Sequence, residues 1–312
     1  MTDYPFIDAK IIADSLHPKF DRRLTTIQVV CPRFIWAEML THRMFSRNAQ
    51  SSRACPVKKM IEEVRTNPVV PIEWGANQPG MQADNLLTTP QLYGAQGAWK
   101  RASTAAANEA EYLMQMGAHK QIVNRILEPY VTISSIITGT EWDNFFKLRI
   151  HEAAQPEIRA TAMAMKAAMD ASEPTVLGYM PHLPYVSEEE VTEIGSVRSA
   201  CMVSAARCAR VSYKNHDGTN CDVGRDMLLA RRLMQDEHWS PFEHQAFASE
   251  TISFLDNFDS FRQFRRTLRQ EAIDRGWDEH RAPEVSTIPG GKAIPSAGPG
   301  GECADLGDGV TL

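Results

Sequence analysis

The sequence predicts a fold that mixes α-helices with a few β-strands, and three stretches indicate it. Residues 24–30 alternate and are rich in β-branched side chains, which is typical of a strand. Residues 96–128 are rich in alanine and predict two helices, with Gly117 between them and Pro129 ending the second. Residues 131–137 are also β-branched, and their pattern fits either a strand or a buried helix.

Further elements follow the same rules. Residues 66–95 are rich in Pro, Gly, Asn and Gln and predict a long ordered loop that lies over a site. Helical periodicity predicts helices over residues 141–152, 157–171, 188–206 and 223–236. In the first of these helices, Arg149 shares a face with three aromatic side chains, those of Trp142, Phe145 and Phe146. An arginine that points inward needs an anionic or planar partner, and a buried carboxylate would serve as well as a ligand.

The whole chain has the composition of a globular protein. It has 312 residues and a net charge of −6, so a general attraction to nucleic acid is not expected. Its six cysteines are irregularly spaced, which indicates neither a disulfide framework nor a metal site and favours a reducing compartment. No apolar run approaches the ~20 residues of a membrane span, and the first residues lack a basic leader, so we expect a cytoplasmic protein. Residues 276–312 are rich in Gly and Pro and are expected to form a disordered tail.

Residues 41–53 form a polar run. The run holds three arginines, a histidine and three serines, and it has no carboxylate. Arginine offers forked donors to phosphate, and serine adds short hydrogen bonds. The run therefore predicts an anion-binding segment at a helix end and the turn after it, although a solvated basic turn would have the same composition.

A second polar motif lies near residue 240. Ser240, Pro241 and Glu243 have the spacing of a capping box, in which Ser240 caps a new helix. The same residues would form this cap with or without a ligand.

Three blocks of sequence together resemble the flavin-dependent thymidylate synthases. The first is Thr41-His42-Arg43 followed, after seven residues, by Ser51-Ser52-Arg53, which is similar to the R-H-R signature of that family. The second runs from Ala209-Arg210-Val211-Ser212 to His238–His244, with Leu233-Met234 between them. The third is Arg125 to Pro129 followed by Asn144 and Arg149. The resemblance covers about residues 24–275, which we expect to be one catalytic domain.

The order of the blocks differs from the family. The A-R-V-S and S-P-F-E-H block comes first in the family and last in this chain. We infer a circular permutation, which requires that residues 172–200 join the two ends of the family's chain.

The resemblance implies an α+β fold and the methylation of dUMP at C5 to give dTMP. Methylenetetrahydrofolate would supply the carbon and NADPH would reduce FAD, which supplies the hydride. It also implies a homotetramer with active sites shared between subunits. No metal is implied or expected.

The resemblance also implies roles for individual residues. Arg149 would contact the pyrimidine ring and activate C5, acting as the catalytic residue. The nucleotide would be bound by Arg149 together with Glu38, Thr41, Gln50, Ser51, Ser52, Arg53 and Arg125. The flavin would be bound by His42, Arg43, Asn144, Ser212, Ser240 and Glu243.

Several positions depart from the family pattern. The first arginine of the signature is Thr41, and a glutamine before it is Glu38. Arg47 or Arg33 is expected to replace the missing charge. These changes leave open C5 methylation or hydroxymethylation of another nucleotide such as dCMP, and an inactive structural or nucleic-acid-binding relative is the alternative of another class.

Overall fold

The computed structural model describes residues 4–211, 222–252 and 257–274. The chain divides into one compact unit, Met1–Thr267, and a second unit, Leu268–Leu312. In the second unit the structure describes only the end of helix α10 (Phe264–Asp274). The expected tail, residues 276–312, and the predicted flavin-binding residue Ser212 lie outside the described residues.

A five-stranded sheet organises the first unit. Its strand order is β3-β4-β2-β1-β5, and a separate pair is formed by β6 and β7. β5 pairs in parallel with β1, and the other pairs are antiparallel. The strands are β1 (Asp8–Leu16), β2 (Arg23–Pro32), β3 (Ser46–Ala49), β4 (Thr132–Gly139), β5 (Thr175–Val176), β6 (Ala246–Ala248) and β7 (Phe261–Gln263). Residues 131–137 are therefore a strand and not a helix, and the mixed α+β fold is confirmed.

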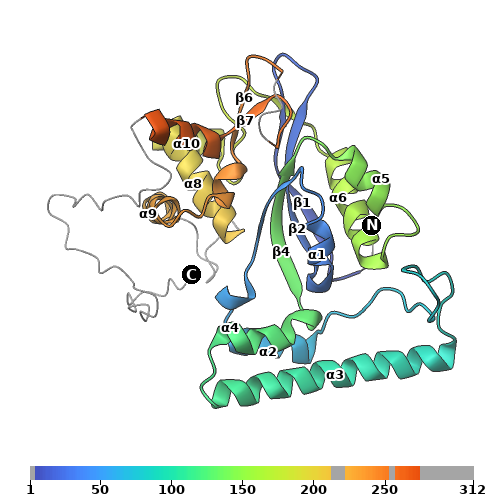
Figure 1. Ribbon diagram of the computed structural model, residues 1–312. Coiled ribbons are helices and arrows are strands. Elements are labelled where there is room, and N and C mark those ends of the chain that lie inside the picture. Colours follow the sequence, from blue (N-terminus) through green and yellow to red (C-terminus); the bar gives the residue numbers. More distant parts are fainter. Residues whose placement is uncertain (1–3, 212–221, 253–256, 275–312) are drawn as a thin grey trace. The chain divides into compact units, whose positions relative to one another are not determined.

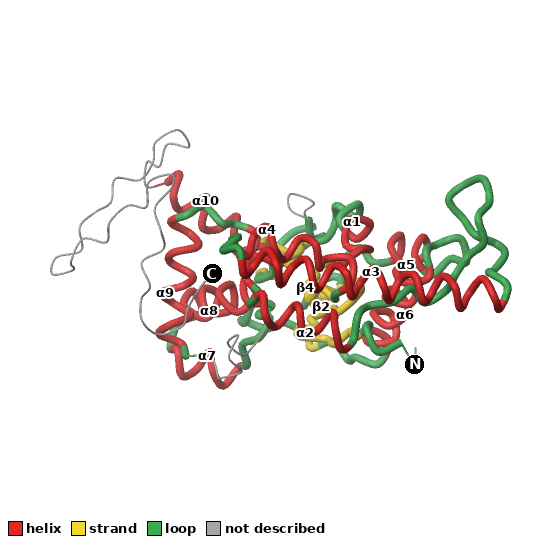
Figure 2. Tube along the Cα trace, turned by 90° about the horizontal axis from the view of Figure 1, so that it is seen from below, coloured by secondary structure: helices red, strands yellow, loops and turns green. Residues whose placement is uncertain are grey.

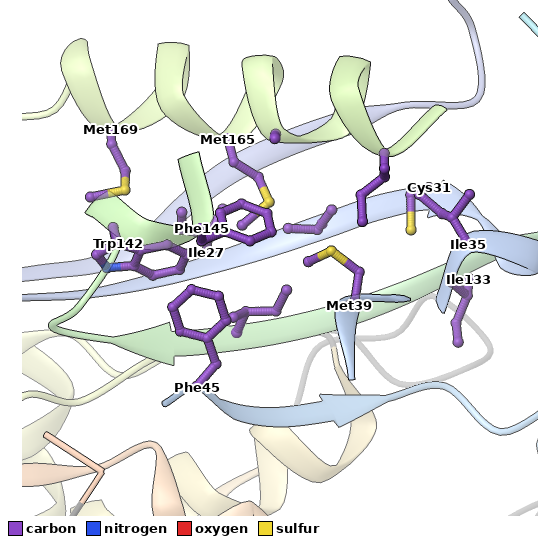
Figure 3. Close-up of a cluster of buried hydrophobic side chains, with 14 residues drawn as sticks. Ile27, Cys31, Ile35, Met39, Phe45, Ile133, Trp142, Phe145, Met165 and Met169 are labelled. Atoms are coloured by element: carbon purple, nitrogen blue, oxygen red, sulfur yellow. The ribbon is translucent and has the colours of Figure 1, made fainter. Parts of the chain in front are cut away.

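One face of the sheet carries the main apolar core. Alternation places Ile27, Val29 and Ile137 on this face, where α5 (Asp143–Arg149) and α6 (Pro156–Asp170) cover it. Met165 and Met169 project from α6 toward the strands (Figure 3). Full burial of these side chains stabilises the unit by roughly 1.5–3 kcal/mol each.

The other face of the sheet meets a region that we call the C-terminal block, residues 177–267. Figure 1 shows its helices α8 and α9 on the side of the sheet opposite α5 and α6. Its described elements are α7 (Glu188–Ile194), α8 (Val197–Arg210), α9 (Val223–Gln235), a 3-10 turn η4 (Ser240–Glu243), β6, β7 and the start of α10. The single helix expected over 188–206 is wrong, because Gly195 adopts φ +70° and ends α7.

Helices near the start of β4 form a third part of the unit (Figure 2). They are α2 (Val57–Thr66), α3 (Thr89–Gln115) and α4 (Lys120–Leu127), and they share a core of their own. Short turns complete the chain: η1 (Arg33–Ile35), α1 (Trp36–Met39), η2 (Ser52–Ala54) and η3 (Glu128–Tyr130). None of the helices in the described ranges is long and apolar enough to span a membrane.

The loop expected over 66–95 is shorter than predicted. α3 already begins at Thr89, because the backbone N–H of Thr88 donates to the side chain of Gln91 at 3.1 Å. Hydrogen bonds to two helices hold the start of the loop. The N–H of Ile72 donates to Glu157 of α6 at 2.8 Å, and the indole of Trp99 of α3 donates to the carbonyl of Val69 at 2.9 Å. These anchors hold it on α6 and α3.

The end of β4 offers a test of the packing that positions the site. A Cβ added to Gly139 would lie 2.7 Å from Cδ1 of Phe45, whose buried ring packs against that of Trp142 with centroids 4.4 Å apart. Gly139→Ala is therefore expected to lower the free energy of unfolding by about 1–3 kcal/mol. The control is Gly178→Ala, where nothing lies within 4 Å of the added Cβ. Urea unfolding measures both, and an equal, small effect would contradict this packing.

Candidate active site

The turn between α1 and β3 is built around one arginine. The Nη1 atom of Arg47 donates to the carbonyl oxygens of Met39, Leu40 and His42, at 3.3, 2.9 and 2.9 Å. These bonds satisfy carbonyl groups left over at the end of α1. Arg47 therefore shapes the turn, and the expectation that it replaces the charge missing at Thr41 is not supported.

Arg149 reaches this turn from the end of α5. Its Nε donates to Nε2 of His42 at 2.9 Å, and its Nη2 donates to Oγ1 of Thr41 at 3.1 Å. Its Nη1 lies 3.8 Å from a carboxylate oxygen of Glu38. Four residues predicted from the sequence thus lie together, and a partner for Arg149 is found among them. The side chain of Arg149 is 22% exposed, so a ligand can still reach it.

These contacts fix the protonation of His42. Because Nε2 accepts a hydrogen bond, the ring is neutral and carries its hydrogen on Nδ1. Burial, and then the charges of Arg149 and Arg47, lower the pKa of His42. Burial raises the pKa of Glu38, while Arg149 opposes that shift. The cluster therefore combines a fixed cation, a neutral imidazole and a carboxyl group that favours its protonated form more than usual.

A cavity of about 490 Å³ opens beside the turn. Five lining residues come from the turn and two from α5, together with the acidic side chains of Glu141 and Asp259. The lining residues are Thr41, His42, Arg43, Met44, Phe45, Glu141, Asn144, Phe145 and Asp259. The expected flavin-binding residues His42, Arg43 and Asn144 are therefore brought together here. The loop over residues 67–88 does not line the cavity, so its predicted place over a site is not observed.

The donor set of this cavity fits a flavin nucleotide. Arg43 is exposed at the rim, where a guanidinium suits a pyrophosphate, and Asn144 offers both an amide donor and a carbonyl acceptor. The rings of Phe45 and Phe145 form an apolar wall, with centroids 5.4 Å apart. Asp259 adds no free negative charge, since its carboxylate pairs with Arg22.

The residues expected to bind the phosphate lie elsewhere. β3 separates them from the cavity, because Thr41–Phe45 precede this strand and Ser51–Arg53 follow it. Ser51 and Arg53 are exposed, while Ser52 is buried with its Oγ unpartnered among the described residues. Gln50 donates its backbone N–H to Ser134 at 2.8 Å, which continues the pairing of β3 with β4.

Arg125 lies on α4, which packs against η2. The side chain of Asn124 holds the two elements together through bonds to the carbonyls of Ser52 and Cys55, at 2.7 and 3.0 Å. Arg125 itself pairs with Glu128 at 2.8 Å, and the same carboxylate lies 3.2 Å from Arg33. The two arginines therefore share one carboxylate and keep one net positive charge, and the replacement of the charge missing at Thr41 by Arg33 stays a prediction.

The capping box predicted at Ser240 is wrong. The residue before η4 is Trp239, and neither Ser240 nor Glu243 makes a cap hydrogen bond. The carboxylate of Glu243 instead pairs with Arg265 at the start of α10, and Ser240 is exposed. Neither residue lines the cavity.

Some residues at the site were not found by sequence reasoning. Gln263 of β7 donates to Oγ of Ser46 and to the carbonyl of Glu243, both at 2.8 Å, so it ties η4 to β3. Asp259 and Glu141 line the cavity. A carboxylate in a loop gives no local signal of such a role, because these contacts depend on residues distant in the sequence.

A family model described as thymidylate synthase complementing protein, Thy1, matches residues 10–175. The match includes the turn, the cavity residues of α5 and Arg149. The chain belongs to the Thy1 family. Members of the Thy1 family are flavin-dependent, and membership supports an enzyme of the methyltransferase type in nucleotide biosynthesis.

The Thy1 match ends before the C-terminal block. The A-R-V-S and S-P-F-E-H motifs, Ala209–Ser212 and His238–His244, lie beyond residue 175. The circular permutation therefore stays a prediction.

Solved structures similar to this Thy1 chain include two of the UMP/dUMP methylase PolB from Streptomyces cacaoi. The structure bound with 5-Br dUMP has a TM-score of 0.44 and 18% identity, over 52% of this chain and 89% of that chain. The structure bound with 5-Br UMP has a TM-score of 0.42 and 18% identity, over 52% and 88%. No curated protein matches the sequence.

Proposed function

We propose that this Thy1 protein transfers a one-carbon unit to C5 of a pyrimidine deoxynucleotide, most simply in the reductive methylation of dUMP to dTMP. The carbon donor is methylenetetrahydrofolate and the reductant is NADPH. The observation that carries the proposal is the contact of Arg149 with Thr41 and His42, inside the region that the family model matches.

Arg149 is the proposed catalytic residue. A fixed guanidinium stabilises negative charge that develops on the pyrimidine ring as C5 becomes nucleophilic. The bond from His42 and the contact with Glu38 orient this guanidinium before a substrate arrives. Glu38, Thr41 and Gln50 are proposed as further contacts of the nucleotide, and Ser51, Ser52, Arg53 and Arg125 as its phosphate site.

FAD would be held by His42, Arg43 and Asn144 at the cavity, and when bound it supplies the hydride that reduces the transferred carbon. The proposed contacts of Ser212, Ser240 and Glu243 with the flavin come from the resemblance. Ser240 and Glu243 do not line the cavity of this chain, so a second subunit is the simplest source of such contacts. We therefore propose a homotetramer with shared sites, in the cytoplasm.

Flavin binding tests this proposal first. The purified protein is titrated with FAD, and the visible absorption spectrum of the flavin is recorded. We expect a shifted flavin spectrum and a further change when dUMP is added. A protein that binds no FAD would refute the proposed enzyme.

A second candidate substrate is dCMP, and Glu38 favours it. In its ionised form, Glu38 beside Arg149 can accept a hydrogen bond from the exocyclic amine of cytosine, whereas it repels O4 of uracil. This candidate reaction is methylation or hydroxymethylation at C5 of the cytosine ring.

Glu38→Gln separates the two substrates. The amide of glutamine can donate to O4, so the variant is expected to shift relative binding toward dUMP by about tenfold, or roughly 1.4 kcal/mol. Calorimetric titration of wild type and variant with dUMP and dCMP measures this ratio. Glu62→Gln, at an exposed position of α2, is the matched control. A ratio that Glu38→Gln leaves unchanged would exclude Glu38 from base recognition.

A further inference from the structure

Five buried side chains form a continuous polar chain between the sheet and the C-terminal block. Oγ of Ser15 lies 2.7 Å from Nδ1 of His182, and Nε2 of that ring lies 2.7 Å from Oγ1 of Thr26. Oγ1 of Thr26 lies 2.7 Å from Oγ1 of Thr138, which lies 2.8 Å from Nδ1 of His244. Each of the five is at most 5% exposed. Strands β1, β2 and β4 are thus joined to two histidines of the block.

The chain holds two neutral imidazoles. A neutral imidazole donates from one nitrogen and accepts at the other, and a hydroxyl group can both donate and accept. All four hydrogen bonds of this polar chain can therefore run from Ser15 to His244 or from His244 to Ser15. In both directions every partner of the two rings is an uncharged hydroxyl group. Nε2 of His244 is buried and has no hydrogen-bond partner among the described residues. A proton added to either ring would therefore create a buried cation without a carboxylate partner.

The charged groups nearest the rings are already engaged. On β1, the carboxylate of Asp14 accepts bonds from Arg23, Thr25 and Ser172. Its field favours protonation of His182, but burial outweighs it and lowers the pKa of His182 to about 3. Burial, and then the field of His182, lower the pKa of His244 to about 3.

In the part of the chain that the structure describes, the other elements around His244 provide no free negative charge. The carboxylate of Glu243, its neighbour in η4, pairs with Arg265. On α8, Ser204 and Cys208 bind the side chain of Gln245, and burial raises the pKa of the Cys208 thiol, so it stays uncharged. Burial therefore dominates at both rings and favours their neutral form.

The backbone of His182 also joins two segments of the block, residues 177–187 and strand β6. The N–H of His182 donates to the carbonyl of Ala246 at 2.8 Å, and the N–H of Ala246 donates to the carbonyl of His182 at 3.3 Å. His182 lies in the segment that would join the two permuted halves, and His244 directly follows η4. Both rings are almost completely buried, so we expect the backbone around them, including this bridge, to open when a ring reaches water.

We propose that His182 and His244 form an acid-sensitive latch, which holds the C-terminal block on the sheet while both rings are neutral and opens locally when one is protonated. The direction of the pH dependence follows from proton linkage. The buried rings bind protons less readily than rings in water, whose pKa is about 6.5. The stabilisation is complete above that value and is lost as the pH falls below it. The proposal does not depend on the enzymatic activity.

Amide hydrogen exchange of the full-length protein tests the latch. Protection factors are measured at about pH 7.5 and about pH 5 and corrected for the intrinsic pH dependence of exchange. The amides of His182 and Ala246 are expected to lose protection by on the order of thirtyfold for each ring that reaches water. Amides of α6, on the opposite face of the sheet, are expected to keep theirs.

Variants make the test specific. In His182→Gln combined with His244→Gln, the amide of Ala246 is expected to exchange at a corrected rate that no longer depends on pH. His151→Gln, which removes an exposed histidine after α5, is expected to behave like wild type. If the double variant does not fold, the wild-type comparison still decides. Equal loss of protection in α6 and at Ala246, or no loss at Ala246, would overturn the latch.

Discussion

Asp226→Ala is expected to destabilise the protein by about 3–5 kcal/mol. The carboxylate of Asp226 on α9 accepts from Nε of Arg207 at 2.9 Å and also pairs with Arg210, both on α8. Asp226 and Arg207 are completely buried. The variant leaves a buried guanidinium with less compensating charge, although Glu190 of α7 still binds Arg207 at 2.8 Å.

Urea unfolding measures this effect, and α9 offers a matched control. Asp236 pairs with Arg232 at 3.7 Å on the same helix, but both side chains are more than half exposed. Asp236→Ala is expected to change the free energy of unfolding by about 0–1 kcal/mol. If Asp226→Ala were equally mild, the buried ion pairs would not be what holds α8, the helix that ends in the A-R-V-S motif, against α9.

Arg149→Ala is expected to lower turnover by about 10²–10³-fold, since it removes a charge that stabilises the reacting ring. The protein should remain folded, because Arg149 is partly exposed and its bonds to Thr41 and His42 contribute only about 1–2 kcal/mol in total. The readouts are the initial rate with dUMP, methylenetetrahydrofolate and NADPH, and the spectrum of bound FAD.

Lys147→Ala is the control for Arg149→Ala. Lys147 is an exposed cation on the same helix, so its removal changes the net charge equally and is expected to leave turnover nearly unchanged. Turnover in Arg149→Ala that matched this control would refute the role given to Arg149.

Local patterns were sufficient for much of the fold. The β-branched run at residues 24–30 is the central strand β2, and the alanine-rich stretch is α3 and α4 with Gly117 between them. β3 was missed because Ser46–Ala49 is polar and forms a strand only by pairing with β4. That pairing partner is far away in the sequence, so no local pattern could reveal it.

The site, like the fold, combines features that local sequence predicts with features that only the tertiary structure determines. The position of Arg149 on an inward face followed from helical spacing, but its partners Thr41 and His42 are brought to it by tertiary structure. At Ser240 the local pattern failed, because the carboxylate of Glu243 that would complete a capping box is bound by Arg265. A capping motif gives no sign that a residue distant in the sequence, here Arg265, will bind the carboxylate on which the cap depends.

Product analysis of the complete reaction tests the central claim most directly. Purified protein is incubated with FAD, NADPH, methylenetetrahydrofolate and dUMP or dCMP, and the nucleotides are separated and identified by mass spectrometry and NMR. We predict a pyrimidine deoxynucleotide with a new carbon at C5, formed only when FAD and the folate are present. Unchanged dUMP and dCMP, in a protein shown to bind FAD, would contradict the proposed function.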